Sequence, residues 1–181
     1  ILANITFREG AKVLADRGLS LDMMQAFPQM PEIADFAKAV PELTIILNHI
    51  GGLSRSGIYA NKDDEVIPVW REGIAAVAAC PNVVVKLGGL GMPRIGFGWH
   101  AREVPIGSQE LAEAMSPWLT YCIEQFGPDR CMFESNFPPD KVSFSYNVMY
   151  NAFKIMSGSY SSTERAAMLH DTAVRVYRID V

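Results

Sequence analysis

The sequence predicts an α/β fold built around a parallel β-sheet. Segments with helical periodicity alternate along the chain with short apolar runs of the length of strands. Two of these runs, residues 44–47 and 83–85, are apolar without alternation, which is typical of strands that helices cover on both faces. Polar, glycine-rich loops follow the runs. The predicted order is one helix, three strand–helix units, and a last strand followed by two helices.

The first part of the chain supplies a helix and one strand–helix unit. Apolar residues at a helical period predict a helix over residues 7–17, and Gly18 stands where a helix C-cap is expected. The apolar run 19–24 follows as the first strand. Five apolar residues on one face predict a helix over residues 31–40, which the second strand, residues 43–47, follows.

The middle of the chain repeats this alternation. Residues 63–79 predict a helix from their apolar spacing, although Pro68 and Gly73 disfavour its first half. The β-branched run 82–86 is the third strand. The longest helical pattern, residues 108–126, begins at a serine that we expect to act as the N-cap and ends before a Gly-Pro pair.

The last part contributes one strand and two helices. Residues 131–133 form the fourth predicted strand, and helical patterns cover residues 143–156 and 162–177. Ser161 and Glu164 have the spacing of a capping box at the start of the final helix.

Two architectures fit this order, a closed barrel and an open doubly wound sheet, and periodicity does not separate them. No linker, low-complexity segment or repeat other than the strand–helix unit is visible in the sequence. We therefore expect residues 1–181 to belong to one domain.

The composition is that of a globular domain, with 49% hydrophobic and 20% charged residues. The net charge is −4 and no window gathers Lys and Arg, which argues against nucleic acid or an anionic membrane as a partner and favours a small molecule. No stretch approaches the roughly 18–20 apolar residues of a membrane span, and the first residues lack the order of a signal peptide.

The three cysteines, Cys80, Cys122 and Cys131, lie within or beside apolar segments and form no CxxC pair. We interpret them as reduced thiols of the core rather than as metal ligands or a disulfide. Such thiols indicate a cytoplasmic protein.

His49 is the sharpest candidate for a functional residue, because it follows the second predicted strand. Reactive residues of parallel α/β folds cluster in the loops after the carboxyl ends of strands. An imidazole there can ligate a metal, polarise a carbonyl or transfer a proton. The alternative is a structural role in which His49 ties its loop with a hydrogen bond.

Three further side chains lie in or near the next loop. Lys86 ends the third strand and either reaches the mouth of a site, where it would bind an acidic substrate, or points to solvent at the rim. Arg94 and His100 lie in an insertion of about 20 residues, a length that fits a lid or substrate-binding loop as well as a surface loop. The glycine run 88–91 lacks the spacing of phosphate-binding loops.

Three blocks of the sequence resemble, in their order, the amidohydrolase-related family (amidohydrolase 2), which contains 2-pyrone-4,6-dicarboxylate lactonase and sugar-acid lactonases. The blocks are Leu43-Thr-Ile-Ile-Leu-Asn-His-Ile-Gly-Gly52, Asn82-Val-Val-Val-Lys-Leu-Gly-Gly-Leu90 and Phe126-Gly-Pro-Asp-Arg-Cys-Met-Phe-Glu-Ser-Asn-Phe-Pro138. The resemblance extends over essentially the whole chain. It implies a TIM (β/α)8 barrel, a fold of metal-dependent hydrolases, of which this chain carries the C-terminal half, strands five to eight with their flanking helices.

The resemblance also implies a site, with His49 after strand six and Asn136 after strand eight. It implies one divalent metal, zinc or manganese, with His49 as a ligand. Two departures from the family pattern count against this metal. The family's His-x-His pair after strand one is absent, and Asn136 stands where many relatives have Asp. Glu134 and Asp140 are the nearest substitute carboxylates.

We therefore expect a hydrolase that opens a lactone or a related cyclic ester of a small organic acid, at a site completed by an N-terminal half that this chain lacks. His49 would polarise the carbonyl or bind the metal, and Asn136 would position the nucleophile. The residues expected to bind substrate are Lys86, Arg94, His100, Glu134 and Asp140.

Two alternatives stay open. One is a decarboxylase or another carbon–carbon lyase of the same fold. The other is a half-barrel without catalysis that binds a partner or pairs with its own copy, because four strands cannot close an eight-stranded barrel and leave sheet edges open.

Overall fold

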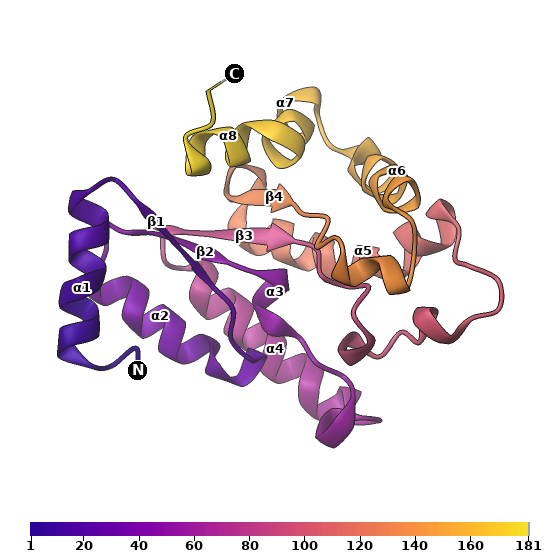
Figure 1. Cartoon of the computed structure of the whole chain (residues 1–181), viewed down its shortest axis with the longest axis horizontal. Helices are drawn as coiled ribbons and strands as arrows, with labels where there is room; N and C mark the ends of the chain where they lie inside the picture. Colours follow the sequence, from indigo (N-terminus) through magenta and orange to yellow (C-terminus); the bar gives the residue numbers. More distant parts are fainter. Residues whose placement is uncertain (181) are drawn as a thin grey trace.

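Four parallel strands form the centre of the computed structural model, which describes residues 1–180 (Figure 1). The strands are β1 (Ser20–Met23), β2 (Thr44–Leu47), β3 (Val83–Leu87) and β4 (Cys131–Phe133). They lie side by side in the order in which they occur in the chain. A doubly wound sheet reverses its strand order at a switch point, whereas a barrel does not, so the order favours the barrel.

The helices follow the predicted alternation. They are α1 (Ile5–Asp16), α2 (Met30–Ala39), the short α3 (His49–Gly52), α4 (Asp63–Ala78), α5 (Ser108–Phe126), α6 (Tyr146–Met156), α7 (Ser162–Ala166) and α8 (Thr172–Tyr177). Gly18 has a φ of 64° directly after the end of α1, and Ser161 and Glu164 form the predicted capping box of α7.

Apart from shifts of one or two residues at helix ends, three features of the predicted helices differ from the structure. The N-cap of α5 is Gly107 rather than Ser108. Helix α6 begins only at Tyr146, because Ser145 is its N-cap and accepts the Val148 N–H with its side chain. The helix expected over residues 162–177 is divided by a π-helical segment between α7 and α8. Packing determines such local irregularities, and periodicity alone does not show them.

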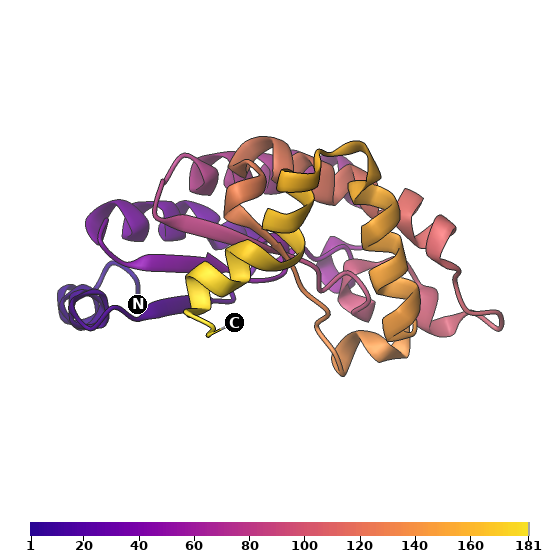
Figure 2. The same ribbon diagram turned by 90° about the horizontal axis from the view of Figure 1, so that it is seen from above.

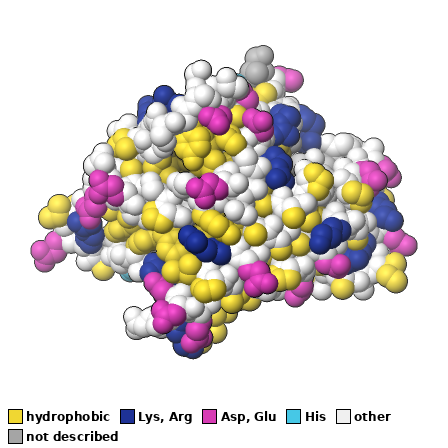
Figure 3. Space-filling view, turned by 180° about the vertical axis from the view of Figure 1, so that it is seen from behind, with side chains coloured by type: hydrophobic (Ala, Val, Ile, Leu, Met, Phe, Trp, Pro, Cys, Tyr) yellow, Lys and Arg dark blue, Asp and Glu magenta, His cyan; other side chains and the backbone are white. Residues whose placement is uncertain are grey.

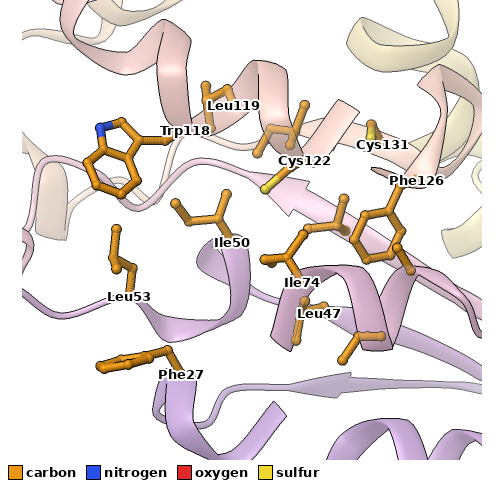
Figure 4. Packing of buried hydrophobic residues seen from close by; sticks show 14 of the residues in the cluster. Phe27, Leu47, Ile50, Leu53, Ile74, Trp118, Leu119, Cys122, Phe126 and Cys131 are labelled. Atoms are coloured by element: carbon orange, nitrogen blue, oxygen red, sulfur yellow. The ribbon is translucent and has the colours of Figure 1, made fainter. Parts of the chain in front are cut away.

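One face of the sheet packs against α2, α4 and α5, which lie together on the same side (Figure 2). Alternate strand residues, such as Leu47 of β2 and Val85 of β3, point into this core, as expected for a pleated strand. Figure 4 shows the packing of this core, with Leu47, Ile74, Leu119, Cys122 and Phe126 among the labelled residues. Cys80, Cys122 and Cys131 are all buried and unpaired, as predicted.

The opposite face of the sheet is partly covered by the C-terminal helix. Ile46, Val84 and Met132 form a second buried cluster with Val176 of α8. Figure 2 shows α8 crossing the strands on the side away from α2 and α4. The prediction that both faces of the strands are covered is therefore confirmed.

Polar side chains tie together the turns at the amino ends of the strands. The Asn82 amide nitrogen lies 3.0–3.1 Å from the carbonyl oxygens of Ala37, Val40 and Leu43. The Arg130 guanidinium donates to the carbonyls of four residues, namely Ala78, Cys80, Val83 and Phe126. In parallel barrels this end of the sheet serves stability, which leaves the carboxyl ends of the strands for chemistry.

The surface carries charges of both signs. On the face shown in Figure 3, which views the molecule from behind, acidic and basic side chains are interspersed among hydrophobic ones. None of the helices within residues 1–180 combines the length and apolar character that crossing a bilayer requires.

Candidate active site

His49, Glu134 and Asn136 lie at the carboxyl rim of the sheet. His49 follows β2 and the other two follow β4, and the loop after β3 lies between them. All carboxyl ends of parallel strands point the same way, which is why loops distant in sequence come together here. The structure therefore places the two predicted catalytic residues on one rim.

His49 and Glu134 form a close pair. Glu134 Oε1 accepts the backbone N–H of His49 at 3.1 Å and also contacts the ring nitrogen Nδ1. Both side chains are 13% exposed. A carboxylate has only acceptors, so a neutral His49 ring paired with it places its proton on Nδ1 and its lone pair on Nε2. Sequence reasoning placed both residues in the site but did not pair them.

The backbone at this rim is held in an unusual conformation. His49, Ile50 and Asn136 have φ angles of 51°, 46° and 48°, in the left-handed region that residues with a side chain rarely adopt. Such conformations persist only where surrounding contacts enforce them, and they concentrate at functional sites. One such contact is the Trp70 indole N–H, which donates to the Ile50 carbonyl at 2.8 Å.

Two glycines after β3 lie directly against the His49–Glu134 pair. A Cβ atom on Gly89 would approach the His49 ring to 2.7 Å, and one on Gly88 would approach Glu134 Cγ to 2.4 Å. Any larger residue would have to displace the pair. We call Gly88 and Gly89 the glycine platform.

Asp140 is a buried carboxylate that joins two of the rim loops. Its Oδ2 accepts the Gly91 N–H at 3.0 Å, and its Oδ1 accepts the Asn136 side-chain amide at 2.6 Å. Burial raises the pKa of Asp140, while these hydrogen bonds and the nearby His49 oppose the shift. Since Asn136 donates its amide to Asp140, its own carbonyl oxygen is the atom left to accept a hydrogen bond.

Arg94 comes close to this network from the β3–α5 loop. Its carbonyl accepts the Arg55 N–H at 2.9 Å, which ties the loop to the segment that follows His49. Its Nε and Nη2 atoms are buried and have no hydrogen-bond partner among the described residues. Burial lowers the pKa of Arg94, and the charge of Asp140 opposes that shift.

Lys86 does not belong to the His49 cluster, because it points to the face that α8 covers. Its Nζ lies 2.6 Å from Asp22 Oδ1 on β1, and the Tyr177 hydroxyl donates to the same oxygen at 2.9 Å. Burial lowers the pKa of Lys86, but the bonds to Asp22 and Tyr177 outweigh it and the net shift is upward. Sequence reasoning missed Asp22, whose signal is an acidic residue inside an apolar strand.

His100 lies apart from His49 in the structure. It is exposed on a 3-10 turn at residues 99–101 and lines a hollow of about 320 Å³ with Lys141 and Ser143. The lining of this hollow does not include His49, Glu134 or Asn136.

The chain matches the amidohydrolase family over residues 3–179. It belongs to the amidohydrolase family. An uncharacterized protein of Sinorhizobium fredii is 37% identical over 96% of this chain and 52% of its own length. The L-fucono-1,5-lactonase of Burkholderia multivorans is 26% identical over 96% of this chain and 56% of its own length. The chain thus spans about half the length of the curated relatives it matches.

Two crystal structures of an amidohydrolase from Burkholderia multivorans share the fold. One holds HEPES and the other zinc, with TM-scores of 0.84 and 0.83 and 24% identity. Both cover 99% of this chain and about 60% of the solved chain, 60% and 59% respectively. The four strands of this chain therefore correspond to half of an amidohydrolase TIM barrel, as the sequence predicted.

The side chains of residues 1–180 do not by themselves fit the divalent metal expected for an amidohydrolase. No group of three or more His, Cys, Asp and Glu residues in this range is placed to hold one. His49 offers only Nε2, since Nδ1 faces Glu134, and both oxygens of Asp140 accept protein hydrogen bonds. Asn136 has a neutral amide where a metal-binding carboxylate would stand. Zinc or manganese at His49 stays a prediction.

Proposed function

We propose that the protein hydrolyses a lactone, or a related cyclic ester of a small organic acid, at the rim that carries His49. The observation that carries the proposal is the His49–Glu134 pair on the same rim as Asn136, which provides a proton acceptor and a hydrogen-bonding amide at the carboxyl ends of barrel strands. The lactonase among the relatives supports the substrate class. We further propose that an N-terminal half-barrel completes the site and that the protein is cytoplasmic.

The geometry supports a simple order of events. His49 Nε2 takes a proton from a water molecule as its oxygen adds to the lactone carbonyl, and the Asn136 carbonyl oxygen holds that water by accepting its second proton. The tetrahedral intermediate then expels the ring oxygen. The proton on His49 passes to this leaving oxygen, while the water's second hydrogen, which only hydrogen-bonds to Asn136, stays on the new carboxyl group, so that the products are the open hydroxy acid and the neutral imidazole.

Substrate binding is assigned to the basic residues around this rim. Arg94 lies within electrostatic range of Asp140 and would bind an anionic part of the substrate. His100 would contact the substrate from the loop between β3 and α5. Lys86 lies on the face of the sheet that α8 covers, so it would bind the substrate only if the substrate displaces Asp22.

Replacement of His49 tests the proposal. In the full-length protein, His49→Ala should lower kcat on sugar-acid lactones by roughly 100-fold or more, since general base catalysis typically contributes that much. A pH-stat measures the acid released by each lactone. His170→Ala is the matched control, because His170 is exposed and bonds only to its neighbour Asp171.

Three results would overturn the proposal. They are the absence of turnover on any lactone, full activity without His49, and release of carbon dioxide without ring opening, which would identify a lyase. Treatment with EDTA tests the order of events separately. If EDTA abolishes the activity and zinc or manganese restores it, the reaction does not depend on His49 alone.

A further inference from the structure

We propose that Glu134 is a positioning residue that holds His49 with its proton on Nδ1. The two glycines of the platform leave the space that the His49 and Glu134 side chains occupy. This inference rests on the proposed function, for which it identifies the residue that controls the base. It assigns Glu134 a role different from the substrate binding expected from the sequence.

The first argument is that one oxygen fixes two parts of His49. Glu134 Oε1 accepts the His49 backbone N–H and faces ring Nδ1, so it restrains the backbone and the ring together. An oxygen that already accepts the backbone N–H acts as an acceptor towards Nδ1 as well. The lone pair of the imidazole is therefore confined to Nε2.

The second argument is that the other carboxylate near His49 is held in place by bonds to other groups. Asp140 lies within electrostatic range of His49, but its two oxygens accept the Gly91 N–H and the Asn136 amide. Glu134 is thus the acceptor that the rim provides for Nδ1.

The third argument is steric. A Cβ on Gly89 would lie 2.7–2.8 Å from His49 Cγ, Nδ1 and Cβ, and a Cβ on Gly88 would lie 2.3 Å from the Glu134 carbonyl oxygen. The ring and the carboxylate can occupy their positions only because both residues beneath them lack a side chain. The left-handed backbone of His49, with a φ of 51°, also needs such fixed surroundings.

Nitrogen-15 NMR of histidine-labelled full-length protein tests the inference without a substrate. The chain has three histidines, and His49→Gln assigns the signal of His49. The neutral His49 ring should be protonated on Nδ1 in the native protein. Glu134→Ala should shift the proton towards Nε2, whereas Glu134→Gln, which keeps an acceptor oxygen, should retain the native pattern.

Kinetics on the lactone that the full-length protein turns over provide the second readout. Glu134→Ala should lower kcat by about 10- to 100-fold with KM changed less than about threefold, and Glu134→Gln should recover part of the loss. A rise in KM without a loss of kcat in Glu134→Ala would instead indicate that Glu134 binds substrate, and it would overturn the inference. Failure of all lactones would remove the proposed function but leave the tautomer result standing.

A glycine pair supplies a matched test of the platform. Gly89 and Gly98 have φ angles of 71° and 72°, but a Cβ on Gly98 would have nothing within 4 Å. Alanine at either position therefore has to adopt a similar left-handed φ, but only the Cβ of Gly89→Ala would overlap the His49 ring. Gly89→Ala should lose the Nδ1–H signal and Gly98→Ala should keep it. An unchanged His49 signal in Gly89→Ala would overturn the inference, as would Nε2–H in the native protein.

Discussion

Asp140 shows how a single buried side chain shapes the rim. It is 1% exposed and accepts one hydrogen bond from the β3 loop and one from the β4 loop, so it fixes the distance between them. Asn136 takes its orientation from this carboxylate. The Asn136 amide is thus held by an acid four residues further along the chain.

Asp140 should make stability fall as the pH rises. Because burial raises its pKa in the folded protein, the unfolded chain loses the proton first, near pH 3.8, and the free energy of unfolding decreases between that pH and the folded pKa. Urea unfolding at pH 3.5–6.5 should show that the stability of the native protein relative to Asp140→Asn declines across this window.

Asp63 is the control, because its pKa is shifted in the opposite direction from that of Asp140. Arg55 Nε donates to it at 2.9 Å, and this hydrogen bond lowers the pKa of Asp63. Its contribution is therefore present above pH 3.8 and lost as the pH falls through the lower folded pKa. The stability of the native protein relative to Asp63→Asn should rise with pH. Equal slopes for the two substitutions would contradict the assignment of Asp140.

At the scale of elements, the C-terminal segment from α7 to α8 covers part of the sheet face opposite α2, α4 and α5. Val176 enters the cluster on that face, and Tyr177 bonds to Asp22 of β1, 155 residues earlier. Thr172 and Arg175 bond to the carbonyl of Asp129, just before β4. The placement of α8 thus depends on contacts at both edges of the sheet.

The cap of α7 should contribute measurably to stability. Ser161 Oγ accepts the Glu164 N–H at 3.3 Å, and Glu164 Oε2 accepts the Ser161 N–H at 2.8 Å. Ser161→Ala should lower the free energy of unfolding by about 1 kcal/mol. Ser162→Ala, one residue later on the exposed first turn, should change it by less than about 0.5 kcal/mol. Urea denaturation measures both, and equal effects would show that the cap is not stabilising.

At the scale of the whole molecule, β1 and β4 are the edges of an open sheet. No described residue pairs with the outer edge of β1, and apolar side chains are exposed beside it, including Leu19 and Met24. Unpaired strand edges next to exposed apolar residues favour association with another chain. We therefore expect this edge to favour contact with another polypeptide.

The 181-residue chain on its own should therefore associate as its concentration rises. The double substitution of Leu19 and Met24 by Lys should weaken this association severalfold, because it places charge beside the β1 edge. Substitution by Lys of Ile58 and Val104, which are more exposed and lie outside the strands, should not. Sedimentation velocity measures the association. A strict monomer at all concentrations, or equal effects of both pairs, would contradict this view of the edge.

The sequence by itself determined the order of strands and helices, the family, and the loops that carry His49 and Asn136. These features follow from periodicity and from short blocks, which are local properties of the chain. Only the tertiary structure decided which side chains meet. Glu134 lies 85 residues from His49 and Lys86 lies 64 residues from Asp22, and their pairing depends on how parallel strands align. Local patterns contain no information on that alignment, since each contact forms only when the whole sheet is assembled.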